Sequence, residues 1–370
     1  MMKGVLKSFG SNGNGQLGLG HEEDTHIPTR CVVPTDFPAN SPPKCIVAGG
    51  NHTLVLFPCG RLFATGLNNY GQCGISPATA HKFDTFHEVP APPPEDGGTW
   101  ELVSAGWEFS VLVSTTGKIY VCGFGGKGEL GLGAQSTTIT DLQAISKFTT
   151  EKIVQIASGM AHTLVVLSSG EVWGWGTARK GQLGVLSPAE KMLTTPRRIQ
   201  IDFPVARAVC GREFSFVVDH TGERHCMLGV NGRFGLLEQT PKAGELRGYK
   251  RVGAAWGSVL VLMADGSLVA WGRDDRGQLP PAGLESVHDL AVGSEHALAV
   301  AGGQLVCWGW GEHGNCGKPR SQDGGDVRGE VFAVDAAAAG RESNSRLAAI
   351  GAGCATSWVW VEGEAAAEDD

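Results

Sequence analysis

The stretch SGMAHTLVVLSSGEVWGWGTARKGQLG, residues 158–184, is one copy of a unit that recurs along the chain. An anchor glycine, Gly159, is followed at steps of eleven, six and five residues by Gly170, Gly176 and Gly181. The runs HTLVVL and EVWGW between these glycines are short and apolar, which is typical of β-strands. Glycine adopts backbone conformations at tight turns that other residues avoid. The unit therefore predicts short antiparallel strands, lettered A to D here, joined by tight turns.

Five further copies share this spacing, although two of them deviate from it by one residue at one step. Residues 4–18 repeat the second half of a unit, and residues 353–363 repeat the first half. Six whole units and one divided between the termini make seven, and pairing of the two ends would close a ring of sheets. The sequence therefore predicts an all-β fold, a seven-bladed β-propeller with one blade shared between the N- and C-termini. The six anchors are Gly49, Gly106, Gly159, Gly211, Ala255 and Gly293.

The same pattern sets the expected domain boundaries. Residues 1–363 are expected to form a single propeller domain. The long segment 318–346, between the last whole unit and the C-terminal half unit, is expected to be a mobile loop. Residues 364–370 are rich in acidic residues and are expected to form a disordered tail.

Two glycine-rich loops fit the dinucleotide-binding pattern G-x-G-x-x-G, GFGGKG at 123–128 and GWGEHG at 309–314. In a nucleotide-binding fold this pattern opens a helix inside a strand–helix–strand unit. No amphipathic helical pattern follows either loop, and both loops lie at the same place in the repeat. We therefore interpret both as structural turns and expect no cofactor.

Composition narrows the classes of function. The net charge is −8 and there is no dense Lys/Arg tract, so we expect no direct contact with nucleic acid. No apolar run reaches membrane-spanning length, and the N-terminus lacks the apolar core of a signal peptide, so a soluble intracellular protein is expected. The ten cysteines include no C-x-x-C pair, which favours free, buried thiols over disulfides or a zinc site.

Three histidines, His52, His162 and His296, share one repeat position, three residues after the anchor. A metal site could use them, but Phe109 and Phe214 hold the same position in other units. We therefore expect each histidine to hydrogen-bond a neighbouring turn, and we expect no metal. The chain also lacks G-x-S-x-G, H-E-x-x-H and any distinctive Cys/His pair, so we predict no catalytic residues and no enzyme activity.

The turns between strands offer a candidate surface for a protein partner. In an antiparallel blade the A–B turn and the C–D loop emerge on the same side, which we call the A–B/C–D face. Trp and Arg, which often dominate protein–protein binding energy, occur in the A–B turns. An alternative is that Trp107 and Trp256 fold inward and plug the propeller axis. The predicted partner-binding residues are Trp107, Glu108, Met160, Arg212, Glu213, Trp256 and Glu295 in the A–B turns, and Tyr70 and His313 in the C–D loops.

The repeated patterns A/S-G-x-x-H-T-L, G-x-V-x-x-W-G and G-Q-L-G resemble those of the regulator of chromosome condensation repeat family, from Gly4 to about Gly363. This resemblance implies a seven-bladed propeller whose first and last segments share one blade. The family includes exchange factors for small GTPases, photoreceptors, ubiquitin-ligase modules and adaptors. The resemblance therefore leaves the function open.

The opening segment SFGSNGNGQLGLGHEEDTHIPTR, residues 8–30, and the compact length are similar to the fungal alpha-tubulin suppressor, or killer-toxin-insensitivity, group of this family. That resemblance implies a small CSL-type zinc-finger protein as partner and Elongator as a further one. The implied roles are diphthamide synthesis on elongation factor 2 and Elongator-dependent modification of wobble uridines in tRNA. We accordingly expect a non-catalytic adaptor, monomeric alone, in the cytoplasm and nucleus, without membrane contact.

The alternative is a guanine-nucleotide exchange factor for a Ran-like small GTPase. The founding members of the family use a wedge that protrudes from one blade. No such insertion is evident inside a unit of this sequence, because the extra length lies between units. This favours the adaptor at the level of sequence.

Overall fold

The structure is a computed structural model, and it describes residues 3–146, 148–184, 190–229, 234–318, 325–336 and 346–363. These residues form β-strands numbered β1 to β26 and no α-helix. Within them, no helix has the length and hydrophobicity needed to span a bilayer. The all-β prediction is therefore confirmed.

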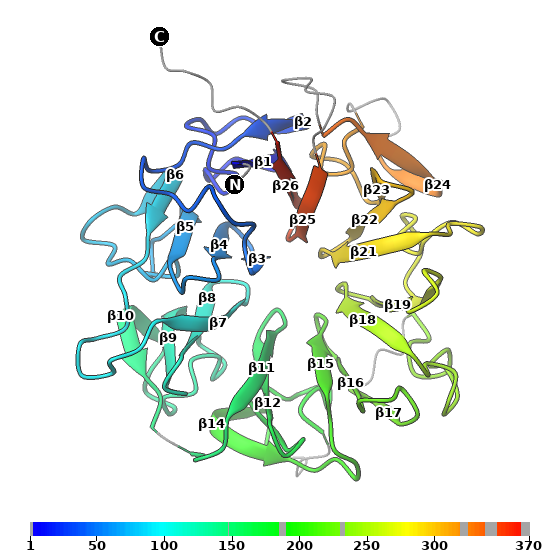
Figure 1. Cartoon of the computed structure of the whole chain (residues 1–370). Coiled ribbons are helices and arrows are strands. Elements are labelled where there is room, and N and C mark those ends of the chain that lie inside the picture. The colour runs from blue at the N-terminus through cyan, green and yellow to red at the C-terminus, as the bar shows by residue number, and fades with distance from the viewer. Residues whose placement is uncertain are drawn as a thin grey trace.

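Seven antiparallel sheets, the blades, are arranged around a central axis (Figure 1). Blade 1 contains β3 (Cys45–Ala48), β4 (His52–Leu56), β5 (Leu62–Leu67) and β6 (Lys82–Glu88). Blade 2 contains β7 (Trp100–Ala105), β8 (Phe109–Ser114), β9 (Ile119–Phe124) and β10 (Thr138–Ala144). Blade 3 contains β11 (Ile153–Ser158), β12 (His162–Leu167), β13 (Val172–Thr177) and β14 (Met192–Ile199).

The remaining blades continue the ring in chain order. Blade 4 contains β15 (Arg207–Cys210), β16 (Ser215–Val218) and β17 (His225–Leu228), and blade 5 contains β18 (Tyr249–Ala254), β19 (Ser258–Met263) and β20 (Leu268–Gly272). Blade 6 contains β21 (Val287–Val292), β22 (His296–Ala301), β23 (Gln304–Gly309) and β24 (Val327–Val334). Blade 7 contains β25 (Arg346–Ala352), β26 (Thr356–Glu362), β1 (Gly4–Gly10) and β2 (Thr25–Arg30).

Blade 7 closes the ring with strands from both ends of the chain. β1 pairs with β26 along its whole length, from Gly4 opposite Glu362 to Gly10 opposite Thr356 (Figure 1). Gly4 is required here because a Cβ atom at this position would lie 2.2 Å from the ring of Trp360. The predicted seven-bladed propeller with one blade shared between the termini is confirmed.

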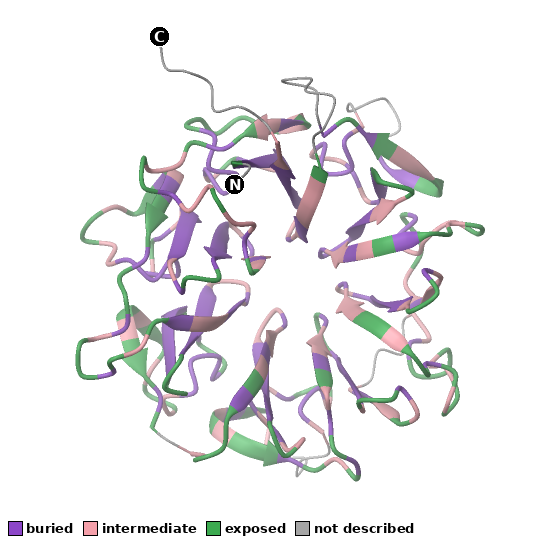
Figure 2. Cartoon of the chain, viewed as in Figure 1, coloured by how far each residue is buried: buried purple, intermediate pink, exposed green. Residues whose placement is uncertain are grey.

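The core lies between adjacent blades, around their second strands. Every residue of β8 is buried, whereas the outermost strand of the same blade, β10, is mostly exposed (Figure 2). Tryptophans of the W-G motifs fill this core: Trp175 and Trp308 are fully buried. Their indole Nε1 atoms donate to backbone oxygens of the preceding blade, at 2.7 Å to Glu129 and 3.1 Å to Gln278. The W-G tryptophans thus hold neighbouring blades together.

The structure corrects the predicted loop at 318–346. Val327–Val334 forms β24, which pairs with β23 and buries both of its terminal valines, so the prediction of a mobile loop is wrong for this part. Its backbone groups complete the sheet of blade 6 as a fourth strand. Residues 319–324 and 337–345 of the predicted loop, and the predicted tail 364–370, lie outside the described residues.

Among the residues that the structure describes, blades 4 and 5 have three strands each. In blade 5 the segment that would supply a fourth strand contains Pro280 and Pro281, which have no backbone N–H to donate to a ladder. In blade 4 residues 234–248 form turns instead of a strand, and Leu236 and Leu246 cover the sheet with buried side chains.

Candidate partner-binding face

The A–B turns meet around the axis at one end of the propeller and hydrogen-bond to one another. The backbone N–H of Gly50 donates to the oxygen of Trp107 at 2.9 Å, and that of Trp107 donates to Met160 at 3.1 Å. On the other side of the ring, the N–H of Trp256 donates to the oxygen of Ser294 at 2.8 Å, and that of Ser294 to Gly353 at 3.0 Å. Because these turns are held by their neighbours, the side chains that they carry have a defined position.

Trp107 and Trp256 come from blades 2 and 5 and meet across the axis. Their ring centroids are 5.6 Å apart and the rings are inclined by 48°. Both side chains are half-buried, so each keeps a surface in contact with solvent. Their mutual contact at the axis is the geometry that the alternative of a plug requires, while their exposed surfaces remain accessible to a partner.

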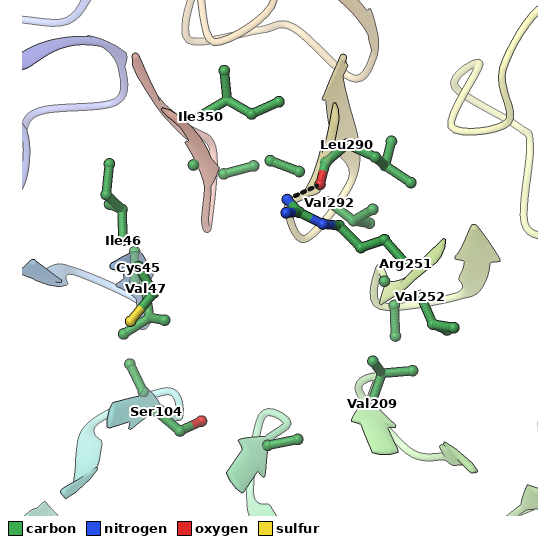
Figure 3. A pocket seen from close by; sticks show the side chains of 18 of the residues that line it. Cys45, Ile46, Val47, Ser104, Val209, Arg251, Val252, Leu290, Val292 and Ile350 are labelled. Atoms are coloured by element: carbon green, nitrogen blue, oxygen red, sulfur yellow. Dashed lines mark hydrogen bonds between the residues drawn. The ribbon is translucent and has the colours of Figure 1, made fainter. Parts of the chain in front are cut away.

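A central channel of about 600 Å³ runs beneath these rings and is lined by the first strands of the blades (Figure 3). Most of the side chains in its lining are small and apolar, and they include those of Val47, Val292 and Ile350. Arg251 also points into the channel, where its guanidinium donates to the oxygen of Leu290 at 3.2 Å. The same guanidinium pairs with Asp289, so its charge is balanced within the wall.

Four of the predicted residues share one cavity beside Trp256. The guanidinium of Arg212 lies over the Trp256 ring, 5.5 Å from its centroid, a cation–π arrangement. A second arginine, Arg273, lies 5.1 Å from the centroid of Phe234. The cavity between them has a volume of about 390 Å³. It is lined by Arg212, Glu213, Phe234, Trp256, Gly257, Arg273 and Glu295.

Glu295 is a buried acid at the base of this cavity, with 7% of its surface exposed. It forms an ion pair with Arg273, which also pairs with Asp275 at 2.5 Å. Its other oxygen accepts a hydrogen bond from the amide of Gln278 at 2.7 Å. Burial raises the pKa of Glu295, whereas Gln278 and Arg273 favour the ionised form. The carboxylate is thus held in place by its neighbours, and it positions Arg273 beneath the cavity.

The other predicted residues lie in different surroundings. Glu108 and Met160 are half-buried in the ring of A–B turns. Tyr70 packs on the exposed Phe124 of the next blade, with centroids 5.2 Å apart. His313 pairs with Asp24 at 2.7 Å and contacts Trp310 edge-on. Neither Tyr70 nor His313 lines the cavity beside Trp256.

Sequence reasoning missed three residues of this region, Phe234, Arg273 and Trp310. A second cavity of about 190 Å³ shares Trp256, Arg273 and Glu295 with the first and adds Trp310 to its wall. Arg273 directly follows the repeat glycine Gly272, so its place in the unit could have marked it. Trp310 is the second tryptophan of CWGWG. It directly follows the repeat glycine Gly309, whereas the packing tryptophan Trp308 precedes that glycine.

The three repeat histidines form buried hydrogen bonds between blades. His52, His162 and His296 each place Nε2 2.9 Å from a serine hydroxyl of the next blade, on Ser110, Ser215 and Ser357 respectively. Each serine hydroxyl donates in turn to a backbone oxygen, so Nε2–H is the donor to the serine. Burial lowers the pKa of each histidine to about 4.

The predicted hydrogen bonds thus exist, although the direct partner is a strand serine instead of a turn. No group of three or more potential metal ligands occurs within the described ranges. The ten cysteines are free thiols, of which only Cys59 is exposed.

Known proteins share this repeat along the whole chain. The profile of the RCC1-like domain family matches residues 5–359. RCC1 repeat-containing protein C10F6.04 of Schizosaccharomyces pombe is 30% identical over 380 residues, which cover 97% of this chain and 99% of the relative. The secretion-regulating guanine nucleotide exchange factor of Bos taurus is 30% identical over 365 residues, which cover 86% of this chain and 77% of the relative.

A solved structure supports the same assignment of fold. Prp20p from Saccharomyces cerevisiae superposes with a TM-score of 0.82 over 99% of this chain and 93% of that chain, at 20% sequence identity. At this identity the likeness shows a shared fold. Together with the family match, it establishes that the chain belongs to the RCC1-like domain family of β-propellers.

Proposed function

We propose that the protein binds a small GTPase through its A–B/C–D face and promotes release of the bound guanine nucleotide. The observation that carries this proposal is the similarity to a relative named as a guanine nucleotide exchange factor, over 86% of this chain. The face has the composition of a protein-binding surface, because half-exposed tryptophans and arginines gather on it. This favours the exchange factor over the adaptor expected from sequence.

In this role the protein forms and breaks no covalent bond. A propeller that binds the nucleotide-free GTPase more tightly than the loaded form weakens nucleotide binding by the same factor, through linkage. Trp256 and Arg212 would supply the aromatic and cationic contacts, and the ring of A–B turns would hold them in position.

The test is release of a fluorescent GDP analogue from purified GTPases, including a Ran-like one, with and without the protein. We expect release from one GTPase to accelerate by about tenfold or more. Trp256→Ala should remove about 2 kcal/mol or more of binding energy, as hot-spot residues do. Lys118→Glu is the matched control, because Lys118 is exposed in the B–C turn of blade 2 on the opposite face. No acceleration with any GTPase would contradict the proposal.

The second candidate is the adaptor for a small CSL-type zinc-finger protein, with Elongator as a further partner. The observation that favours it concerns the strands: every strand within the described ranges belongs to one of the seven sheets, so no extra wedge strand is seen there. In this role the protein would support diphthamide synthesis and Elongator-dependent tRNA modification in the cytoplasm and nucleus.

One pull-down separates the two candidates. The tagged protein is incubated with cell extract, with or without GTP, and the bound proteins are identified by mass spectrometry. Recovery of a CSL-type zinc protein that GTP does not release supports the adaptor. Recovery of a GTPase that GTP releases supports the exchange factor.

A further inference from the structure

Charges on the A–B/C–D face are distributed unevenly among the blades. In blades 5 and 6 the acidic groups near the cavity are matched by arginines, which balances the local charge. Asp326, for example, has only 5% of its side chain exposed and contacts two arginines. The ion pairs are Arg273–Asp275, Arg273–Glu295, Arg276–Asp326 and Arg328–Asp326.

Blades 3 and 4 present a group of cations without such partners, which we call the basic arc: Arg179, Lys180 and Arg212. All of them are exposed, and no ion pair to any of the three is found among the residues that the structure describes. The loop that carries Arg179 and Lys180 packs against the start of β16, where the Ser215 hydroxyl donates to the oxygen of Gln182 at 2.9 Å. This contact places the loop beside the A–B turn that carries Arg212.

The sign of the basic arc is opposite to that of the whole protein. The chain carries a net charge of −8, yet the arc has three cations and one exposed carboxylate nearby, Glu213. Unpaired, exposed arginines and lysines attract carboxylates, and an arginine can bind a carboxylate through two parallel hydrogen bonds. The arc is therefore complementary to an acidic ligand.

Arg212 belongs both to the basic arc and to the wall of the cavity beside Trp256. Its guanidinium lies 5.5 Å from the centroid of the Trp256 ring, which leaves the N–H groups at its edge available to a ligand. The cavity of about 390 Å³ next to it has the rings of Trp256 and Phe234 in its wall. A chain that contacted Arg212 could thus place an apolar side chain between these rings.

We propose that the basic arc and this cavity bind an acidic segment of a partner protein, with carboxylates on Arg179, Lys180 and Arg212 and one aliphatic or aromatic side chain in the cavity. This inference rests on the proposed function only in that both use the A–B/C–D face. Charge complementarity selects an acidic protein segment, and the rings of Trp256 and Phe234 in the cavity wall select a segment with a single hydrophobic anchor. Three cations would neutralise few phosphates, so the site is less suited to nucleic acid.

The experiment uses the full chain and three fluorescein-labelled twelve-residue peptides, read by fluorescence anisotropy. The first peptide has Asp and Glu around a central Leu-Trp pair, the second has Lys at the acidic positions, and the third has Ala-Ala at the centre. We expect binding of the first, about tenfold weaker binding of the third because the cavity stays empty, and no binding of the second. Raising the salt concentration should weaken binding of the acidic peptide.

Variants locate the binding site. Arg212→Glu, and the double variant Arg179→Glu/Lys180→Glu, should each weaken binding of the acidic peptide by about tenfold, or about 1.4 kcal/mol. Trp256→Ala should abolish the preference for Leu-Trp over Ala-Ala. Lys118→Glu is the matched charge reversal on the opposite face and should change binding by less than about twofold. Circular dichroism checks that each variant is folded.

Equal binding of the acidic and lysine peptides, or an equal loss with Lys118→Glu, would overturn the proposal. It would also be overturned if single-stranded RNA displaced the acidic peptide at a lower concentration than unlabelled peptide does. The assay contains no GTPase, so its outcome is independent of the exchange assay. Peptide binding without exchange would keep this site and reject the exchange factor, and exchange without peptide binding would do the reverse.

Discussion

Adjacent positions of the same A–B turns behave in opposite ways. The position three residues after the anchor is buried in every blade and holds His, Phe, Ser or Thr. The positions one and two residues after the anchor lie in the ring of A–B turns and hold side chains as different as Trp107, Met160 and Arg212. The buried position must satisfy the same packing against the next blade each time, whereas the surroundings of the other two positions differ from blade to blade: Trp107 meets Trp256, and Glu295 pairs with Arg273. The repeat thus keeps the contacts between blades constant, while the residues of the A–B turns vary and can serve a partner.

The largest expected effect is acid unfolding through the buried histidines. In the unfolded chain an imidazole binds a proton near pH 6.5, whereas in the folded protein His52, His162 and His296 do so only near pH 4. The unfolded state therefore binds more protons between these values, and stability falls as the pH decreases from about 6.5 to about 4. The loss should reach roughly 3 kcal/mol for each histidine. Urea unfolding at pH 7.5, 5.5 and 4.5 measures it.

A second blade pair provides the control for this prediction. In blade 4 the buried position holds Phe214, which packs in the same core cluster as Val259 of blade 5. The double variant His162→Phe/Ser215→Val places the same Phe–Val pair between blades 3 and 4. It should lose about one third of the pH dependence, and an unchanged pH dependence would contradict the assignment of acid sensitivity to these histidines.

An intermediate effect is expected from the serine that joins two blades. Ser215→Ala removes the acceptor for Nε2–H of His162 and the donor to the oxygen of Gln182. Buried polar groups left without partners cost about 1–3 kcal/mol of the free energy of unfolding. Chemical denaturation at pH 7.5 gives this value. Ser168→Ala, at an exposed turn of blade 3, should cost far less, and equal costs would show that the link between blades contributes nothing.

The smallest expected change in stability concerns the contact between Trp107 and Trp256 in the A–B turns. A double-mutant cycle of Trp107→Ala and Trp256→Ala should give a coupling energy of about 0.5–1.5 kcal/mol for their ring contact. Truncation of the fully buried Trp308 should by contrast cost about 3–5 kcal/mol. If Trp107→Ala destabilised the protein as much as Trp308→Ala, the Trp107–Trp256 contact would be part of the structural core instead of a surface feature of the A–B turns.

Most of the fold could be predicted from the sequence because its determinants are local and repeated. Glycines at fixed steps mark the turns, and the two half units at Gly4 and Gly353 predict closure by β1 and β26, which the structure confirms. The fourth strand of each blade was harder to predict. The outer strand carries few buried residues to mark it, and for this reason the sequence predicts a loop where the structure has β24. In blades 4 and 5 no fourth strand occurs among the described residues.

The number of blades, the closure of the ring and the face on which variable residues emerge are predictable without a structure, since each of these follows from spacing within a unit. Which of those residues meet depends on how the blades pack in the folded ring. Trp107 and Trp256 are three blades apart in the chain, and their contact depends on the diameter of the closed ring. Likewise, Arg273 of blade 5 pairs with Glu295 of blade 6, whereas Arg212 has no such partner among the described residues. Contacts across the axis and between blades arise from packing in three dimensions, which periodicity along the chain does not encode.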